Sequence, residues 1–240
     1  VRISSTTGRI LLHGIQNSGN TSTSNTYGVI LGYSSTLSEQ AVINSNLGDV
    51  IIHGDASQRA ASTKRRGVLL FGVRISAGGD IDIFGKSPPT TDSYDVIGWA
   101  TSTVTATGDI NISGERVSGL EFTTLNSGGT TTLSVGQLIG GDLGGDTSGT
   151  TSVATAFAGS GAIVIEPFAT SFTTTQSMAN VTISSSVNSL RIGKSGNTAA
   201  VEIPSNYSIA GNYQVIGSTV TVNGNQTTTG SGNITVTASG

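Results

Sequence analysis

Short apolar clusters recur along the whole chain, and small polar residues separate them. The clusters are built mostly from Val, Ile and Leu, and Gly, Asn, Asp, Ser or Thr bounds each one. This punctuation is typical of short β-strands joined by turns. No long window places apolar residues at the i, i+3, i+4, i+7 spacing of an amphipathic helix. The pattern therefore predicts an almost entirely β structure.

A short motif, Gly-x-apolar-x-apolar-x-Gly, occurs four times in the first half of the chain. Its copies begin at Gly8, Gly48, Gly79 and Gly108, so the interval between them shortens along the chain. Two other classes of cluster lie between the copies. The second class contains 28–32, 67–72 and 95–98, and the third contains Ala41-Val-Ile, Val73-Arg-Ile and Val104-Thr-Ala. The sequence thus repeats a unit of about three short strands.

A repeated unit of this kind cannot bury its apolar face alone, but stacked copies share one continuous core. The pattern predicts an all-β fold, a parallel β-helix (β-solenoid) with about three short strands per coil and coils spaced by about 4.8 Å. A β-sandwich also has many short strands with turn signals. Its strands rarely repeat a near-identical motif at a near-constant interval, so the solenoid is the favoured prediction.

Stacked coils require the same positions to face the core in every copy of the motif. Two alternate positions are apolar throughout, which predicts two inward columns: Ile10, Val50, Ile81 and Ile110, then Leu12, Ile52, Ile83 and Ile112. The positions between them are mostly polar, which predicts two outward columns: Arg9, Asp49, Asp80 and Asp109, then Leu11, Ile51, Asp82 and Asn111. A shift by a single position would turn each set to the wrong face, so the register is well specified.

The repeat divides the chain into three parts. Residues 1–126 carry the longer coils and loops, residues 127–160 form a Gly/Thr-rich segment expected to be irregular or a thin coil, and residues 161–240 return to strand-sized clusters at shorter spacing. We expect the last part to form leaner coils with tight turns.

Composition narrows the possible functions. Charged residues make up only 10% of the chain and the net charge is −3. Nucleic-acid binding is disfavoured, because it needs an extended basic surface. Lys64-Arg65-Arg66 is the only basic run, and we interpret it as a solvated loop. The chain has no Cys and no apolar run long enough for a membrane-spanning helix. No signal peptide is visible at Val1, so we expect either a removed leader or a longer parent chain.

The outward Asp49, Asp80 and Asp109 are the best candidates for chemistry. In stacked coils these carboxylates would lie one strand spacing apart, where Ca²⁺ could screen their repulsion. Parallel β-helix polysaccharide lyases and hydrolases use acidic clusters on an outer face. The simpler interpretation, which we favour, is that each Asp hydrogen-bonds the backbone of its own turn. We therefore predict no catalytic residues and no cofactor.

Other motifs give weaker evidence for a functional site. His13 and His53 share an outward position, but a metal site needs further ligands, so an exposed side-chain stack is favoured. Residues 140–149 resemble one imperfect nonapeptide of a Ca²⁺-binding β-roll, which works only as an array. The two Gly-Lys-Ser triplets, at Gly85 and Gly193, lack the earlier glycine of a P-loop. Thr-rich runs leave an ice-binding solenoid as a further alternative, although they fall at no single coil position.

The tail carries a family resemblance in Ser189-Leu-Arg-Ile-Gly-Lys-Ser-Gly-Asn-Thr-Ala-Ala-Val201, Gly217-Ser-Thr-Val-Thr-Val-Asn-Gly-Asn225 and Gly232-Asn-Ile-Thr-Val236. These segments resemble repeats of the filamentous-haemagglutinin-like large exoproteins, bacterial adhesins of two-partner secretion. The resemblance covers the last quarter of the chain. It implies a right-handed parallel β-helix shaft, export across both membranes, and a role in adhesion, matrix or filament building.

The predicted function is a non-enzymatic structural or adhesive shaft, extracellular or on the bacterial cell surface. A host-cell, glycan or matrix ligand would bind the loops at 16–27, 56–66 and 86–94. The alternative is a carbohydrate-active β-helix enzyme that uses the acidic column. Strand-like sequence reaches both ends without a capping helix, so we expect either covalent continuation in a longer chain or end-to-end stacking of copies.

Overall fold

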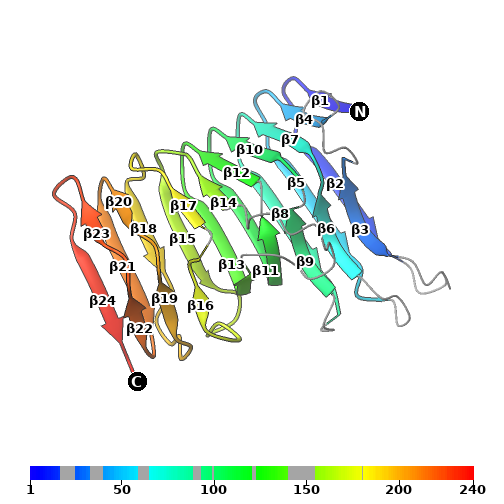
Figure 1. The fold of residues 1–240 in the computed structure, drawn as a ribbon. Helices are drawn as coiled ribbons and strands as arrows, with labels where there is room; N and C mark the ends of the chain where they lie inside the picture. The colour runs from blue at the N-terminus through cyan, green and yellow to red at the C-terminus, as the bar shows by residue number, and fades with distance from the viewer. Residues whose placement is uncertain are drawn as a thin grey trace.

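A computed structural model describes residues 1–16, 25–32, 40–58, 65–88, 93–98, 100–120, 123–139, 155–179 and 181–240. These residues are all β, with no helix among them. Every paired strand runs parallel to its neighbour, and the strands stack along one axis (Figure 1). The predicted all-β architecture of stacked parallel strands is confirmed, and it is consistent with a β-solenoid.

One sheet, here called sheet A, contains one strand from each successive turn of the chain in the first three quarters of the stack. Its order along the axis is β1 (Arg2–Ser5), β4 (Ala41–Ser45), β7 (Val73–Ala77), β10 (Ser102–Ala106), β12 (Thr123–Ser127), β14 (Thr155–Phe157) and β17 (Val181–Ile183). We use "coil" for the segment from one such strand to the next.

The second and largest sheet, sheet B, follows sheet A within each coil. Its order is β2 (Ile10–Ile15), β5 (Val50–Asp55), β8 (Ile81–Lys86), β11 (Ile110–Leu120), β13 (Thr131–Ile139), β15 (Ala162–Pro167), β18 (Ser189–Ile192), β21 (Asn212–Gly217) and β24 (Ile234–Ala238). A branch of the same sheet runs β3 (Thr26–Leu31), β6 (Arg65–Leu70) and β9 (Ser93–Gly98) to β11.

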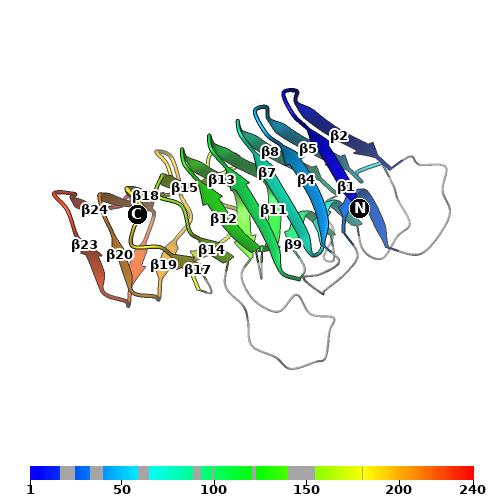
Figure 2. The same cartoon turned by 90° about the horizontal axis from the view of Figure 1, so that it is seen from above.

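Two small sheets complete the tail of the molecule. One is β16 (Gln176–Ser177), β19 (Val201–Ile203) and β22 (Val220–Val222), and the other is β20 (Tyr207–Ile209) with β23 (Gln226–Thr228). Seen from above, the coils lie side by side, with the N- and C-terminal strands at opposite ends of the stack (Figure 2).

The long strand β11 shows how the coils differ in length. Its first half pairs with β8 and its second half with β9. In the first three coils two separate strands occupy this line: β2 and β3, then β5 and β6, then β8 and β9. The register shows the same difference, since 40 residues separate Ile10 from its partner Val50 (50 − 10), whereas 21 residues separate Ile110 from its partner Thr131 (131 − 110). Extra residues in long coils are inserted between strands.

The core follows the inward columns predicted from the sequence. Ile10 stands opposite Val50, which stands opposite Ile81, which stands opposite Ile110. The last three are 0% exposed, and full burial of such a side chain contributes about 1.5–3 kcal/mol. The predicted third class was misaligned at one coil, because Val104 stands opposite Ile75 rather than Val73.

Backbone contact explains the second glycine of the motif. A Cβ on Gly54 would lie 2.0 Å from the carbonyl oxygen of Gly67, and one on Gly14 would lie 1.9 Å from that of Gly28. In Gly85 the same contact, at 1.8 Å, is with the carbonyl oxygen of Asp95. Sheet B and its branch therefore touch backbone to backbone at this corner, and no side chain fits between them. Close approach, rather than a positive φ, requires glycine here.

Candidate functional site

The candidate carboxylates Asp49, Asp80 and Asp109 lie in one row at the corner between sheet A and sheet B. Each carboxylate Oδ1 accepts a hydrogen bond from a backbone N–H of the following coil, and not from its own turn as the sequence suggested. Asp80 N donates to Asp49 Oδ1 (3.0 Å), Asp109 N to Asp80 Oδ1 (2.8 Å) and Thr130 N to Asp109 Oδ1 (2.6 Å). We call this row the aspartate ladder.

The aspartate ladder also explains the glycines that precede Asp80 and Asp109. A Cβ on Gly79 would lie 2.2 Å from Asp49 Oδ1, and one on Gly108 would lie 2.1 Å from Asp80 Oδ1. The carboxylate of one coil thus occupies the space that a side chain would need in the next. The Gly-Asp pair therefore joins consecutive coils through a hydrogen bond between a side chain and the backbone.

Neutral side chains make the same connection in the tail. Asn225 N donates to Asn206 Oδ1 at 2.7 Å, and Asn233 N donates to Asn212 Oδ1 at 3.0 Å. Because an amide oxygen replaces the carboxylate oxygen there, this connection needs an acceptor oxygen and not a negative charge.

Ca²⁺ binding by the aspartate ladder, the less favoured interpretation of the sequence, stays a hypothesis. Across the described ranges, no group of three or more His, Cys, Asp or Glu side chains is placed to hold a metal ion. His13 and His53 occupy the shared outward position that the sequence predicts, with ring centroids 6.3 Å apart and edge to face. The His53 ring also meets the ring of Phe84, at 5.7 Å. These three rings form a stack along the outside of sheet B.

The sequence suggested a solvated loop for the basic run. That prediction is wrong for Arg65 and Arg66. Arg65 and Arg66 begin β6 and are 8% and 3% exposed, while Lys64 lies outside the described residues. The Arg66 guanidinium lies over the ring of Tyr27, 5.6 Å from its centroid, and Nη1 donates to the Tyr27 hydroxyl at 3.2 Å. An adjacent aromatic ring can hold a guanidinium where water is excluded.

Asp95 is a buried carboxylate that sequence reasoning missed. It is 4% exposed, and its Oδ1 accepts from the backbone N (2.6 Å) and Oγ (2.7 Å) of Ser87. Its Oδ2 accepts from Arg116 N at 2.9 Å. Three donors satisfy the buried charge and tie β9 and β11 to the chain that follows β8. The signal in the sequence is a departure from the repeat, since Asp95 stands where other coils carry Gly28 and Gly67.

The remaining motifs have structural places or lie outside the described residues. Lys194 of the second Gly-Lys-Ser triplet donates from Nζ to the Pro167 carbonyl oxygen at 2.7 Å. Residues 140–149 lie outside the described residues. On sheet A, Thr103 and Thr124 stand opposite each other, but the same outward column continues as Arg74 on one side and Ala156 on the other. That column is not the regular threonine rank that ice binding requires.

Comparisons with protein-family models, curated proteins and solved structures found no match to this chain. The likeness of the tail to haemagglutinin repeats therefore stays a prediction. Within the described part of the chain, no helix is long and apolar enough to cross a membrane.

Proposed function

We propose that the chain is the shaft of a right-handed parallel β-solenoid that acts as a structural or adhesive element on a bacterial surface or outside the cell. Right-handed crossover is the strong preference of parallel strands that follow one another through a connection. The stacked coils support the proposal most directly, because a long array of repeated parallel strands extends a surface without needing an enclosed site.

The two end coils support an assembly role. Strands β1 and β2 at one end and β24 at the other each pair with a neighbour on one side only. Their unpaired edges also carry exposed apolar side chains, at Ile3 (38%), Leu11 (55%) and Val236 (49%). Such edges readily pair with another strand. We propose that a second copy of the chain can pair with such an edge.

The aspartate ladder supports the alternative of a carbohydrate-active enzyme less well than it supports a structural role. A general acid or nucleophile must reach its substrate. Each ladder aspartate instead uses one carboxylate oxygen to bind the backbone of the next coil. The simplest role of these carboxylates is to hold the coils in register.

Imaging and mass measurement of the purified chain test the assembly. We expect filaments or oligomers by negative stain, and Val236→Lys should reduce them because Val236 extends the inward column of Val215. Thr235→Lys is the matched control, since Thr235 extends the outward column of Gln214 on the same strand. Monomers at all concentrations, or equal loss of assembly in both variants, would argue against stacking through this edge.

A further inference from the structure

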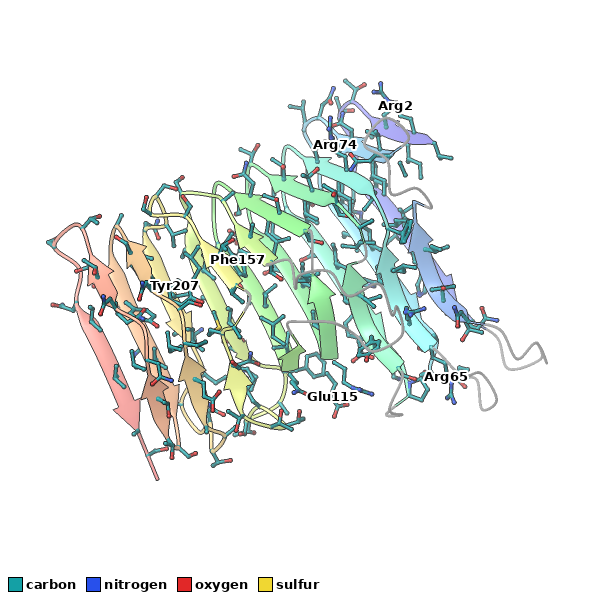
Figure 3. The ribbon with its side chains drawn as sticks, viewed as in Figure 1. Arg2, Arg65, Arg74, Glu115, Phe157 and Tyr207 are labelled. Carbon is teal, nitrogen blue, oxygen red and sulfur yellow. The ribbon has the colours of Figure 1, made fainter. Side chains whose placement is uncertain are left out.

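A shallow hollow lies on the outer surface of sheet A, across β1, β4 and β7. Its volume is about 230 Å³ and its lining residues are Arg2, Ser4, Val42, Asn44, Arg74 and Ser76. Figure 3 labels Arg2 and Arg74 at this part of the molecule. None of these residues entered the sequence-based choice of candidate sites.

The strand register brings the two arginines to one column. Arg2 stands opposite Val42, which stands opposite Arg74. Two strand spacings therefore separate the two backbones, about 9.5 Å. Both side chains are exposed. Among the described residues, neither guanidinium takes part in a hydrogen bond or an ion pair. The guanidinium N–H donors of both arginines are thus available at the two ends of the hollow.

Neutral hydrogen-bonding groups form the adjacent column of the hollow. Ser4 stands opposite Asn44, which stands opposite Ser76. Ser76 Oγ donates to Asn44 Oδ1 at 2.6 Å, which fixes the orientation of the amide. The outward positions on the following strands are Thr103, Thr105, Thr124 and Asn126. No carboxylate occupies an outward position of β1, β4, β7, β10 or β12, so nothing on these described strands neutralises the arginines.

We propose that this hollow binds a carboxylated polysaccharide, with Arg2 and Arg74 pairing with acidic groups of one chain that runs along the solenoid axis. The planar guanidinium presents two parallel donors that match a carboxylate. Hydroxyl and amide groups between the arginines suit sugar hydroxyls. The volume is below that of drug-sized pockets, so it fits a sugar unit of a polymer rather than a protruding protein segment. A nucleic acid would need a longer basic stripe and stacking side chains.

This inference rests on the adhesive part of the proposed function. The residues that carry it all lie on the outer surface of sheet A. Binding of oligogalacturonate, with fully methyl-esterified oligogalacturonate as the uncharged comparison, tests it by calorimetry or thermophoresis. We expect the acid form alone to bind, more weakly as salt rises. Arg74→Gln and Arg2→Gln should each weaken binding about tenfold, the loss expected for one charge-assisted pair. Lys86→Gln, which removes one exposed positive charge on sheet B, should leave binding unchanged.

Several results would overturn the proposal. Absence of binding, equal binding of the esterified sugar, or equal loss in Lys86→Gln would remove the hollow as a specific site. Stronger Arg74-dependent binding of dextran sulfate, or of a single-stranded oligonucleotide, would overturn the assignment to carboxylated sugars. Negative-stain imaging of the same samples separates the two proposals. Filaments without sugar binding refute the site alone, and monomers that bind the sugar refute end-to-end stacking alone.

Discussion

Asp80 is the most informative residue for the role of the aspartate ladder, because it is both donor and acceptor in it. Its backbone N–H donates to Asp49 and its Oδ1 accepts from Asp109 N. Asp80→Ala removes the second bond and keeps the first. Asp80→Asn keeps an acceptor oxygen in the same place and removes the charge. The two variants therefore separate hydrogen bonding from charge.

The expected cost follows from the exposure of the site. A hydrogen bond to a charged group contributes about 1.5–3 kcal/mol, and solvent around the exposed Asp80 reduces this to about 1 kcal/mol. Relief of repulsion from two neighbouring carboxylates offsets part of the loss in both variants. We expect Asp80→Ala to lower the free energy of unfolding by about 1 kcal/mol, a fall in Tm of about 2–4 °C. Asp80→Asn should lie within about 0.5 kcal/mol of the unmodified protein.

Thermal and urea unfolding followed by circular dichroism measure these changes, with and without Ca²⁺. Glu202→Ala is the control for loss of a carboxylate outside the ladder, since Glu202 is exposed on β19. If Asp80→Asn were as damaging as Asp80→Ala, the charge and not the acceptor oxygen would matter. Stabilisation by Ca²⁺ that disappears in Asp80→Asn would likewise refute our reasoning and restore the ladder as a cation site.

Four further predictions concern buried residues. Tyr207 donates to the Met178 carbonyl oxygen at 3.0 Å, so Tyr207→Phe should cost about 1 kcal/mol in a urea titration. The buried Tyr213 hydroxyl has no partner among the described residues, so Tyr213→Phe should be neutral or stabilising, and equal losses in both variants would contradict this. Burial raises the pKa of Tyr207 to about 12. Because the unfolded pKa is about 10, its contribution is complete below pH 10 and is lost as the pH rises towards 12, by up to about 1.4 kcal/mol per pH unit. A pH series with Tyr207→Phe, which should flatten the loss, checks this. Gly54→Ala would place a methyl group 2.0 Å from the Gly67 carbonyl oxygen and should destabilise by several kcal/mol, so a Tm within about 2 °C of the unmodified protein would disprove the backbone contact.

Local alternation in the sequence was enough to predict the strands of the repeated motif and the faces that they bury, but not β13, which lies in a segment expected to be irregular or a thin coil. The columns of Ile10 and Leu12 could be aligned from the motif alone, because side chains alternate with a period of two and the core accepts only apolar ones. The position of the aspartate row followed from the same alignment. Its hydrogen bonds to the next coil did not, since they depend on the stacking distance and on the missing Cβ of the preceding glycine.

Other features were decided by the tertiary structure. The coils carry connections of different length, so sequence spacing alone does not give the register, and Val104 was aligned with Val73 instead of Ile75. Arg66 is buried because its partner ring comes from the preceding coil. The hollow exists because the register brings Arg2 and Arg74 to one column, although they lie far apart in the chain. Which residues share a face is a local property, whereas which residues meet across coils depends on the whole path of the chain.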